Sequence, residues 1–128
     1  MNVLALVEDP WLAGSIRTMI SPLVRDEVNV VTLPGPAQMQ NYLRKNSAQL
    51  MIMDFGLGLV PLVIFRERAG DVPVILLGRN ETMHVQTSRS GVLYKATRAS
   101  LRDVLVLAMS RRGLLDGRDV LEDVIREL

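Results

Sequence analysis

The sequence has no cysteine, a single histidine and few aromatic residues among its 128 residues. The absence of cysteine excludes disulfides and thiolate metal sites, and it fits a reducing compartment. Aromatic residues make up 4% of the chain and hydrophobic residues 48%, so the core must consist mainly of Val, Leu, Ile and Met. We therefore expect one domain that buries an aliphatic core without cross-links.

A strong net charge and long apolar runs are also missing. The formal charge of +1 is too small to indicate a nucleic-acid or membrane partner by electrostatics alone. The opening MNVLALVEDP lacks a basic segment and its apolar run stops at Glu8, which is not typical of a signal peptide. No run approaches the ~20 apolar residues that a membrane span needs. We expect a cytoplasmic protein.

Short apolar segments alternate along the chain with segments of helical periodicity. The apolar segments predict strands over residues 2–7, 28–33, 50–54, 72–77 and 91–95. The periodic segments predict helices over residues 10–25, 37–46, 59–69, 81–88 and 99–112, and FGLG (55–58) is expected to be a flexible loop. Strands that alternate with helices predict an α/β fold, in which a five-stranded parallel sheet has helices on both faces.

The C-terminal residues carry one more apolar stripe at helical spacing. This stripe occupies residues 116–128 and follows a segment with two glycines, Gly113 and Gly117. We divide the chain into a domain of residues 1–112 and a C-terminal linker or dimerisation helix of residues 113–128. A five-stranded domain does not need this helix for its own core. The helix is therefore predicted to cap the domain, to pair in a homodimer or to lead into an effector domain.

Charged residues follow three of the predicted strands. Glu8 and Asp9 follow the first strand, Asp54 the third and Lys95 the fifth. Because ligands bind outside the carboxyl ends of the strands in an open parallel sheet, these side chains converge if strands one, three and five lie close together. The alternative for Glu8 and Asp9 is a solvated pair that stabilises the start of the first helix.

Asp54 is the most informative of these residues. It is the only charged residue in the stretch 50–65. A buried carboxylate is costly unless it is paired or bound to a metal, so Asp54 is expected at the edge of the sheet. Carboxylates and water are the ligands that Mg²⁺ prefers, and a carboxylate beside Mg²⁺ and a lysine suits a phosphoryl acceptor.

Four segments in this order resemble the landmarks of the receiver domain of bacterial two-component response regulators. They are LALVEDP, LMIMDFGL, VPVILLG and LYKA, and the resemblance covers residues 1–112. It implies a flavodoxin-like fold with strand order 2-1-3-4-5. It also implies a signalling domain rather than an enzyme, with a sensor histidine kinase or phosphotransfer protein as partner.

The resemblance assigns roles to individual residues. Asp54 is implied to accept the phosphoryl group, and Lys95 to contact it. The implied Mg²⁺ ligands are Glu8, Asp9, Asp54 and the backbone carbonyl of Gly56.

Two departures from the family pattern concern the phosphate site itself. Gly78 stands where a Ser or Thr is usual, and Arg79 follows it where the family has a small residue. A glycine cannot donate a side-chain hydrogen bond to a phosphoryl oxygen. Either a backbone N–H near Gly78 or the Arg79 side chain then binds the phosphate, or phosphorylation does not switch this domain.

Further departures lie on the fifth strand. Val92 occupies the position of the usual aromatic residue, and Ala96 replaces the proline that follows Lys95. Tyr94 is adjacent to Lys95, so it should point to the opposite face of the strand. These features indicate an atypical receiver.

Three hypotheses follow. The first is a receiver controlled by phosphorylation, and the second is a pseudo-receiver that acts as an interaction and dimerisation module without it. The third is an enzyme of another α/β family, such as a nucleotide or flavin binder. The absence of G-x-G-x-x-G and P-loop motifs argues against this third hypothesis.

Trp11 is expected to pack at the start of the first helix.

Overall fold

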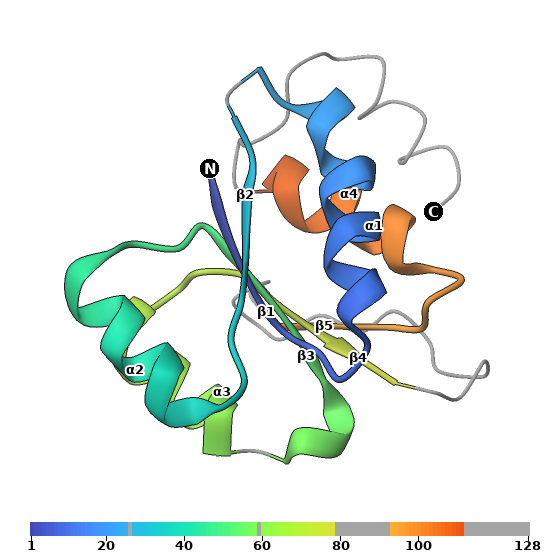
Figure 1. Ribbon diagram of the computed structural model, residues 1–128. Helices are drawn as coiled ribbons and strands as arrows, with labels where there is room; N and C mark the ends of the chain where they lie inside the picture. Colours follow the sequence, from blue (N-terminus) through green and yellow to red (C-terminus); the bar gives the residue numbers. More distant parts are fainter. Residues whose placement is uncertain (26, 59, 79–92, 112–128) are drawn as a thin grey trace.

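The computed structural model describes residues 1–25, 27–58, 60–78 and 93–111 (Figure 1). The predicted helices over residues 81–88 and 116–128, and the boundary after residue 112, lie outside the described residues. None of the helices in the described residues has the length and apolar character that a membrane span requires.

The described strands form one parallel sheet. They are β1 (Asn2–Leu6), β2 (Asn29–Thr32), β3 (Leu50–Asp54), β4 (Val74–Leu77) and β5 (Leu93–Ala96), in the order β2-β1-β3-β4-β5. The predicted α/β fold class and strand order are confirmed. The predicted strands match these bounds within a few residues at each end.

Helices cover both faces of the sheet. The α-helices in the described part of the chain are α1 (Pro10–Ile20), α2 (Pro36–Lys45), α3 (Val60–Ala69) and α4 (Leu101–Arg111). Figure 1 shows α1 and α4 on one face and α2 and α3 on the other. The two faces therefore have separate cores.

The alternation of side chains along each strand supplies both cores. In β3, Leu50 and Ile52 pack in the cluster that contains α1 and α4, whereas Met51 and Met53 pack in the cluster that contains α2 and α3. All four side chains are at most 1% exposed. Burying one such side chain contributes about 1.5–3 kcal/mol, so the central strands account for much of the stability.

Two predicted segments differ from the structure. The first helix ends at Ile20 and not near Arg25, because Pro22 lacks an N–H and its ring clashes with the preceding turn. The chain continues instead as a short 3₁₀ helix, η1 (Ser21–Leu23). The expected flexible loop at 55–58 is wrong for its first three residues, which form a second 3₁₀ helix, η2 (Phe55–Leu57).

Candidate functional site

A pocket of about 610 Å³ lies at the carboxyl ends of the strands. Its described lining residues are Glu8, Asp9, Asp54, Gly56, Leu77, Gly78 and Arg98. Five of them were predicted as site residues from the sequence, and they come from the last residue of β3 and the segments that follow β1, β3 and β4. The structure thus brings together the acidic residues and both glycines, as expected for an open parallel sheet.

Asp54 is the last residue of β3 and is half-buried at the edge of the sheet. It pairs in register with Leu77 of β4, which pairs in turn with Ala96 of β5. Its Oδ2 accepts a hydrogen bond of 2.7 Å from the backbone N–H of Glu8. This bond fixes the orientation of the carboxylate relative to the end of β1.

Asp9 uses both of its carboxylate oxygens. It is the N-cap of α1, and its Oδ1 accepts a hydrogen bond of 3.0 Å from the Trp11 N–H. Its Oδ2 lies 2.9 Å from a terminal guanidinium nitrogen of Arg98. The helix-stabilising role that the sequence left open for Asp9 is therefore present, and Asp9 lines the pocket as well.

Arg98 was not predicted as a site residue. It lies in the turn between β5 and α4, where the Thr97 N–H donates to the Ser100 hydroxyl at 3.0 Å. The predicted site residues all lie at the end of a predicted strand or within two positions of it, whereas Arg98 lies three positions beyond Lys95. The available signal was a cation in the short segment between the fifth strand and the helix that follows it.

Lys95 lies inside β5 and not after it, beside Leu76 of β4. It shares a strand face with Leu93, which packs against the α2 and α3 side. Asp54 alternates with Met53 and therefore shares a face with Ile52 on the α1 and α4 side. Lys95 is not among the described residues that line the pocket.

Two neighbouring expectations have clear outcomes. Tyr94 is fully buried among the residues packed with α1 and α4, so the prediction that it points away from the face of Lys95 is confirmed. Trp11 is 84% exposed, so the expectation that it packs at the start of the first helix is wrong. As residue two of a helix that begins at Pro10, it projects from the exposed side of the first turn. Arg79 and Val92 lie outside the described residues.

The chemistry of the lining suits a hard divalent cation. The carboxylates of Asp9 and Asp54 and the backbone of Gly56 offer oxygen donors, and Mg²⁺ usually takes one or two carboxylates and fills its other positions with water. Within the described residues, no group of three or more His, Cys, Asp or Glu side chains is arranged to hold a metal ion by itself. The lining therefore fits a largely hydrated ion and not a closed protein cage.

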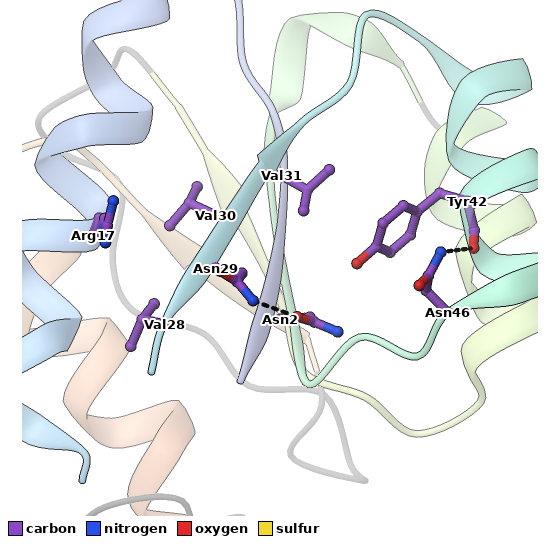
Figure 2. A pocket seen from close by; sticks show the side chains of 8 residues that line it. All are labelled: Asn2, Arg17, Val28, Asn29, Val30, Val31, Tyr42 and Asn46. Carbon is purple, nitrogen blue, oxygen red and sulfur yellow. Dashed lines mark hydrogen bonds between the residues drawn. The ribbon is translucent and has the colours of Figure 1, made fainter. Parts of the chain in front are cut away.

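A second pocket, of about 530 Å³, surrounds the edge strand β2 (Figure 2). This pocket lies at the amino ends of β1 and β2, because its lining includes their first residues, Asn2 and Asn29. The two asparagine side chains are joined by a hydrogen bond of 3.4 Å. Figure 2 shows Val30 directed toward Arg17, and Val31 toward Tyr42 on the other side of the strand. No carboxylate lines this pocket among the described residues, so the acidic pocket is the better candidate site.

The fold is similar to those of several solved receiver domains. The receiver domain of the response regulator RcsB from Salmonella enterica serovar Typhimurium has a TM-score of 0.61 at 18% identity, with 98% of each chain covered. A receiver domain from a Francisella response regulator has a TM-score of 0.57 at 18% identity, covering 86% of this chain and 98% of that chain. No protein-family model and no curated protein matches by sequence.

The chain has the receiver fold. A third receiver domain, from a Pseudomonas aeruginosa sensor histidine kinase, has a TM-score of 0.60 at 17% identity and covers 88% of this chain and 97% of that chain. That structure has a magnesium ion coordinated in its active-site cleft. In the receiver fold, the edge at which Asp54 lies is the one formed by the carboxyl ends of the strands, where ligands bind.

Proposed function

We propose that this chain is an atypical receiver domain that transmits a signal through phosphorylation of Asp54. The observation that supports this most directly is the half-buried carboxylate of Asp54 at the end of β3, in one pocket with Glu8 and Asp9. The receiver fold supports the same role. A sensor histidine kinase or phosphotransfer protein would supply the phosphoryl group in the cytoplasm.

Asp54 acts in this proposal as the nucleophile. Its Oδ2 holds the hydrogen bond from the Glu8 amide, which assigns the attack to Oδ1. An oxygen–phosphorus bond forms as the phosphorus–nitrogen bond of a phosphohistidine donor breaks, and the imidazole keeps the electron pair and takes a proton from solvent. The product is an acyl phosphate on Asp54 and a neutral histidine on the partner.

A divalent cation is part of this proposal. The Glu8, Asp9 and Asp54 carboxylates and the Gly56 carbonyl would hold Mg²⁺. Bound Mg²⁺ would neutralise the charge that develops on the phosphoryl oxygens. Glu8 and Asp9 bring further negative charge into the same pocket, so without a cation they would repel an incoming phosphoryl group.

The phosphorylated domain is proposed to transmit its signal through dimerisation or through an attached effector domain.

Lys95 and Arg79 remain predicted phosphate contacts, but Lys95 would have to reach the pocket from the other face of β5. At Gly78 the backbone amide already donates to the Ala96 carbonyl at 2.8 Å, so it supplies no donor to phosphate in this arrangement.

The departures of this pocket from the usual receiver site favour a second candidate function, a pseudo-receiver that acts only through binding. Gly78, after β4, offers no hydroxyl to the pocket, and Lys95 is not among the described residues that line it. In this case the receiver fold would serve as an interaction module, and Asp54 would be dispensable for signalling.

Beryllofluoride, which mimics an aspartyl phosphate, separates the two candidates. Fluorine NMR should show a bound species in wild type with Mg²⁺ and none in the Asp54→Asn variant. Trp11 fluorescence gives a second readout, because the Trp11 amide is bonded to Asp9 of the pocket. Absence of a bound species in wild type would reject phosphorylation and favour the pseudo-receiver.

A further inference from the structure

Arg98 carries the only positive charge among the described residues that line the acidic pocket. The same lining holds three carboxylates, from Glu8, Asp9 and Asp54. The phosphoryl group of an acyl phosphate carries about −1.5 to −2 charge, which exceeds the single charge that the Asp54 carboxylate loses. The pocket therefore needs a cationic partner for a phosphoryl group, and Arg98 is already placed in it.

The position of Arg98 is set by the turn that carries it. The Thr97 N–H donates to the Ser100 hydroxyl at 3.0 Å, and the Ser100 N–H donates to the Thr97 hydroxyl at 3.3 Å. Thr97 is only 7% exposed, and the Ser100 carbonyl accepts the first helical hydrogen bond of α4, from Val104. Arg98 thus projects from a turn that is anchored at both ends.

The Asp9–Arg98 ion pair connects two helices on the same face of the sheet. Asp9 caps α1, and Arg98 lies just before α4. Their strands β1 and β5 are separated in the sheet by β3 and β4, the strands that carry Asp54 and lead to Gly78. The Arg98 side chain is 64% exposed and the Asp9 side chain 29%, so this ion pair contributes little to the stability of the fold. The Arg98 guanidinium can therefore exchange Asp9 for another anionic partner with little loss of free energy.

We propose that Arg98 is the phosphoryl-recognising side chain of this pocket and takes the place of the hydroxyl that Gly78 lacks. In the unmodified protein Arg98 pairs with Asp9. Once Asp54 is phosphorylated and a divalent cation is bound at Asp9, the guanidinium moves to the phosphoryl oxygens, for which its planar fork is well suited. This inference rests on the proposed phosphorylation of Asp54.

The exchange also supplies a route for the signal. Arg98 lies three positions before Leu101, the first residue of α4, so a change of partner releases the start of α1 and pulls the start of α4 toward the pocket. The signal would thus reach α4 through the Thr97–Ser100 turn and would need no hydroxyl at the end of β4.

The test measures binding of beryllofluoride with saturating Mg²⁺ by fluorine NMR, in the full chain. Arg98→Gln should weaken beryllofluoride binding about five- to tenfold, and Arg98→Lys should lie between Arg98→Gln and wild type. Arg102→Gln is the matched control, because Arg102 is an exposed arginine of α4 that does not line the pocket. It should bind as wild type does.

Mg²⁺ affinity, measured without beryllofluoride, checks the resting state. Arg98→Gln should tighten Mg²⁺ binding by up to about fivefold, since the guanidinium no longer competes for Asp9. Equal beryllofluoride affinities for Arg98→Gln and Arg102→Gln would overturn the role of Arg98 and leave phosphorylation of Asp54 intact. If wild type binds no beryllofluoride, both proposals fail together.

Discussion

The backbone amide of Glu8 donates a 2.7 Å hydrogen bond to Oδ2 of Asp54, joining the ends of the neighbouring strands β1 and β3. The acceptor is a side-chain oxygen, and an asparagine offers an equivalent oxygen at the same position. The negative charge of Asp54 is therefore not needed to keep this contact.

Asp54→Asn should consequently fold as wild type does. We expect its free energy of unfolding, measured by urea titration, to differ by less than about 1 kcal/mol, because the amide oxygen still accepts from Glu8. Asp54→Ala removes the acceptor and should cost more than Asp54→Asn. A large destabilisation of Asp54→Asn would show that the charge itself holds the pocket together.

Asp9 should separate stability from ion binding. Asp9→Ala removes the N-cap of α1 and should lower the free energy of unfolding by about 0.5–2 kcal/mol. Asp9→Asn keeps a good cap and should cost much less, yet it should weaken Mg²⁺ binding because a carboxylate ligand is lost. Urea unfolding and Mg²⁺ titration give the two quantities. Equal destabilisation by both variants would contradict the capping role.

Two glycines should respond in opposite directions to alanine. Gly14 lies inside α1, and a Cβ there would meet nothing within 4 Å, so Gly14→Ala should stabilise the protein by about 0.5–1 kcal/mol. Gly70 follows α3 with φ of +66°, a conformation that costs an L-residue about 1–2 kcal/mol, so Gly70→Ala should destabilise. Thermal unfolding of the pair checks both signs. A gain of stability in Gly70→Ala would contradict the left-handed backbone at this residue.

The Tyr94 hydroxyl is buried and, among the described residues, has no hydrogen-bond partner. An unsatisfied buried polar group costs about 1–3 kcal/mol, so Tyr94→Phe should leave stability unchanged or raise it by about 1 kcal/mol. Tyr42→Phe, at a partly exposed tyrosine, should change little and serves as the control. A loss of stability in Tyr94→Phe, measured by urea unfolding, would reveal a partner for this hydroxyl.

The three central strands β1, β3 and β4 were predictable because they are buried on both faces. Such strands appear in the sequence as continuous apolar runs. The edge strand β2 is partly exposed and was predicted from its β-branched residues instead. Asp54 was predictable for a related reason. A single charge at the end of an apolar strand is stable only at the edge of a sheet, which is where the structure places it.

Helix ends were less predictable. The apolar spacing of the first helix continues past Ile20, but the proline at position 22 ends it. The position of Trp11 could not be predicted from hydrophobicity. An aromatic residue in the first turn packs only if its face of the helix meets the sheet, and this one does not.

The sequence by itself determined the class of fold, the order of the elements and the edge at which the acidic residues gather. Only the tertiary structure decided that Lys95 lies on the other face of β5 and that Arg98 enters the pocket beside Asp9. The physical reason is that apolar patterns specify burial, which is a property of each segment. The sheet face on which a charged side chain lies depends on strand register, because a shift of one residue moves the side chain to the opposite face. Contacts between turns, such as that of Arg98 with Asp9, depend on the path of the whole chain.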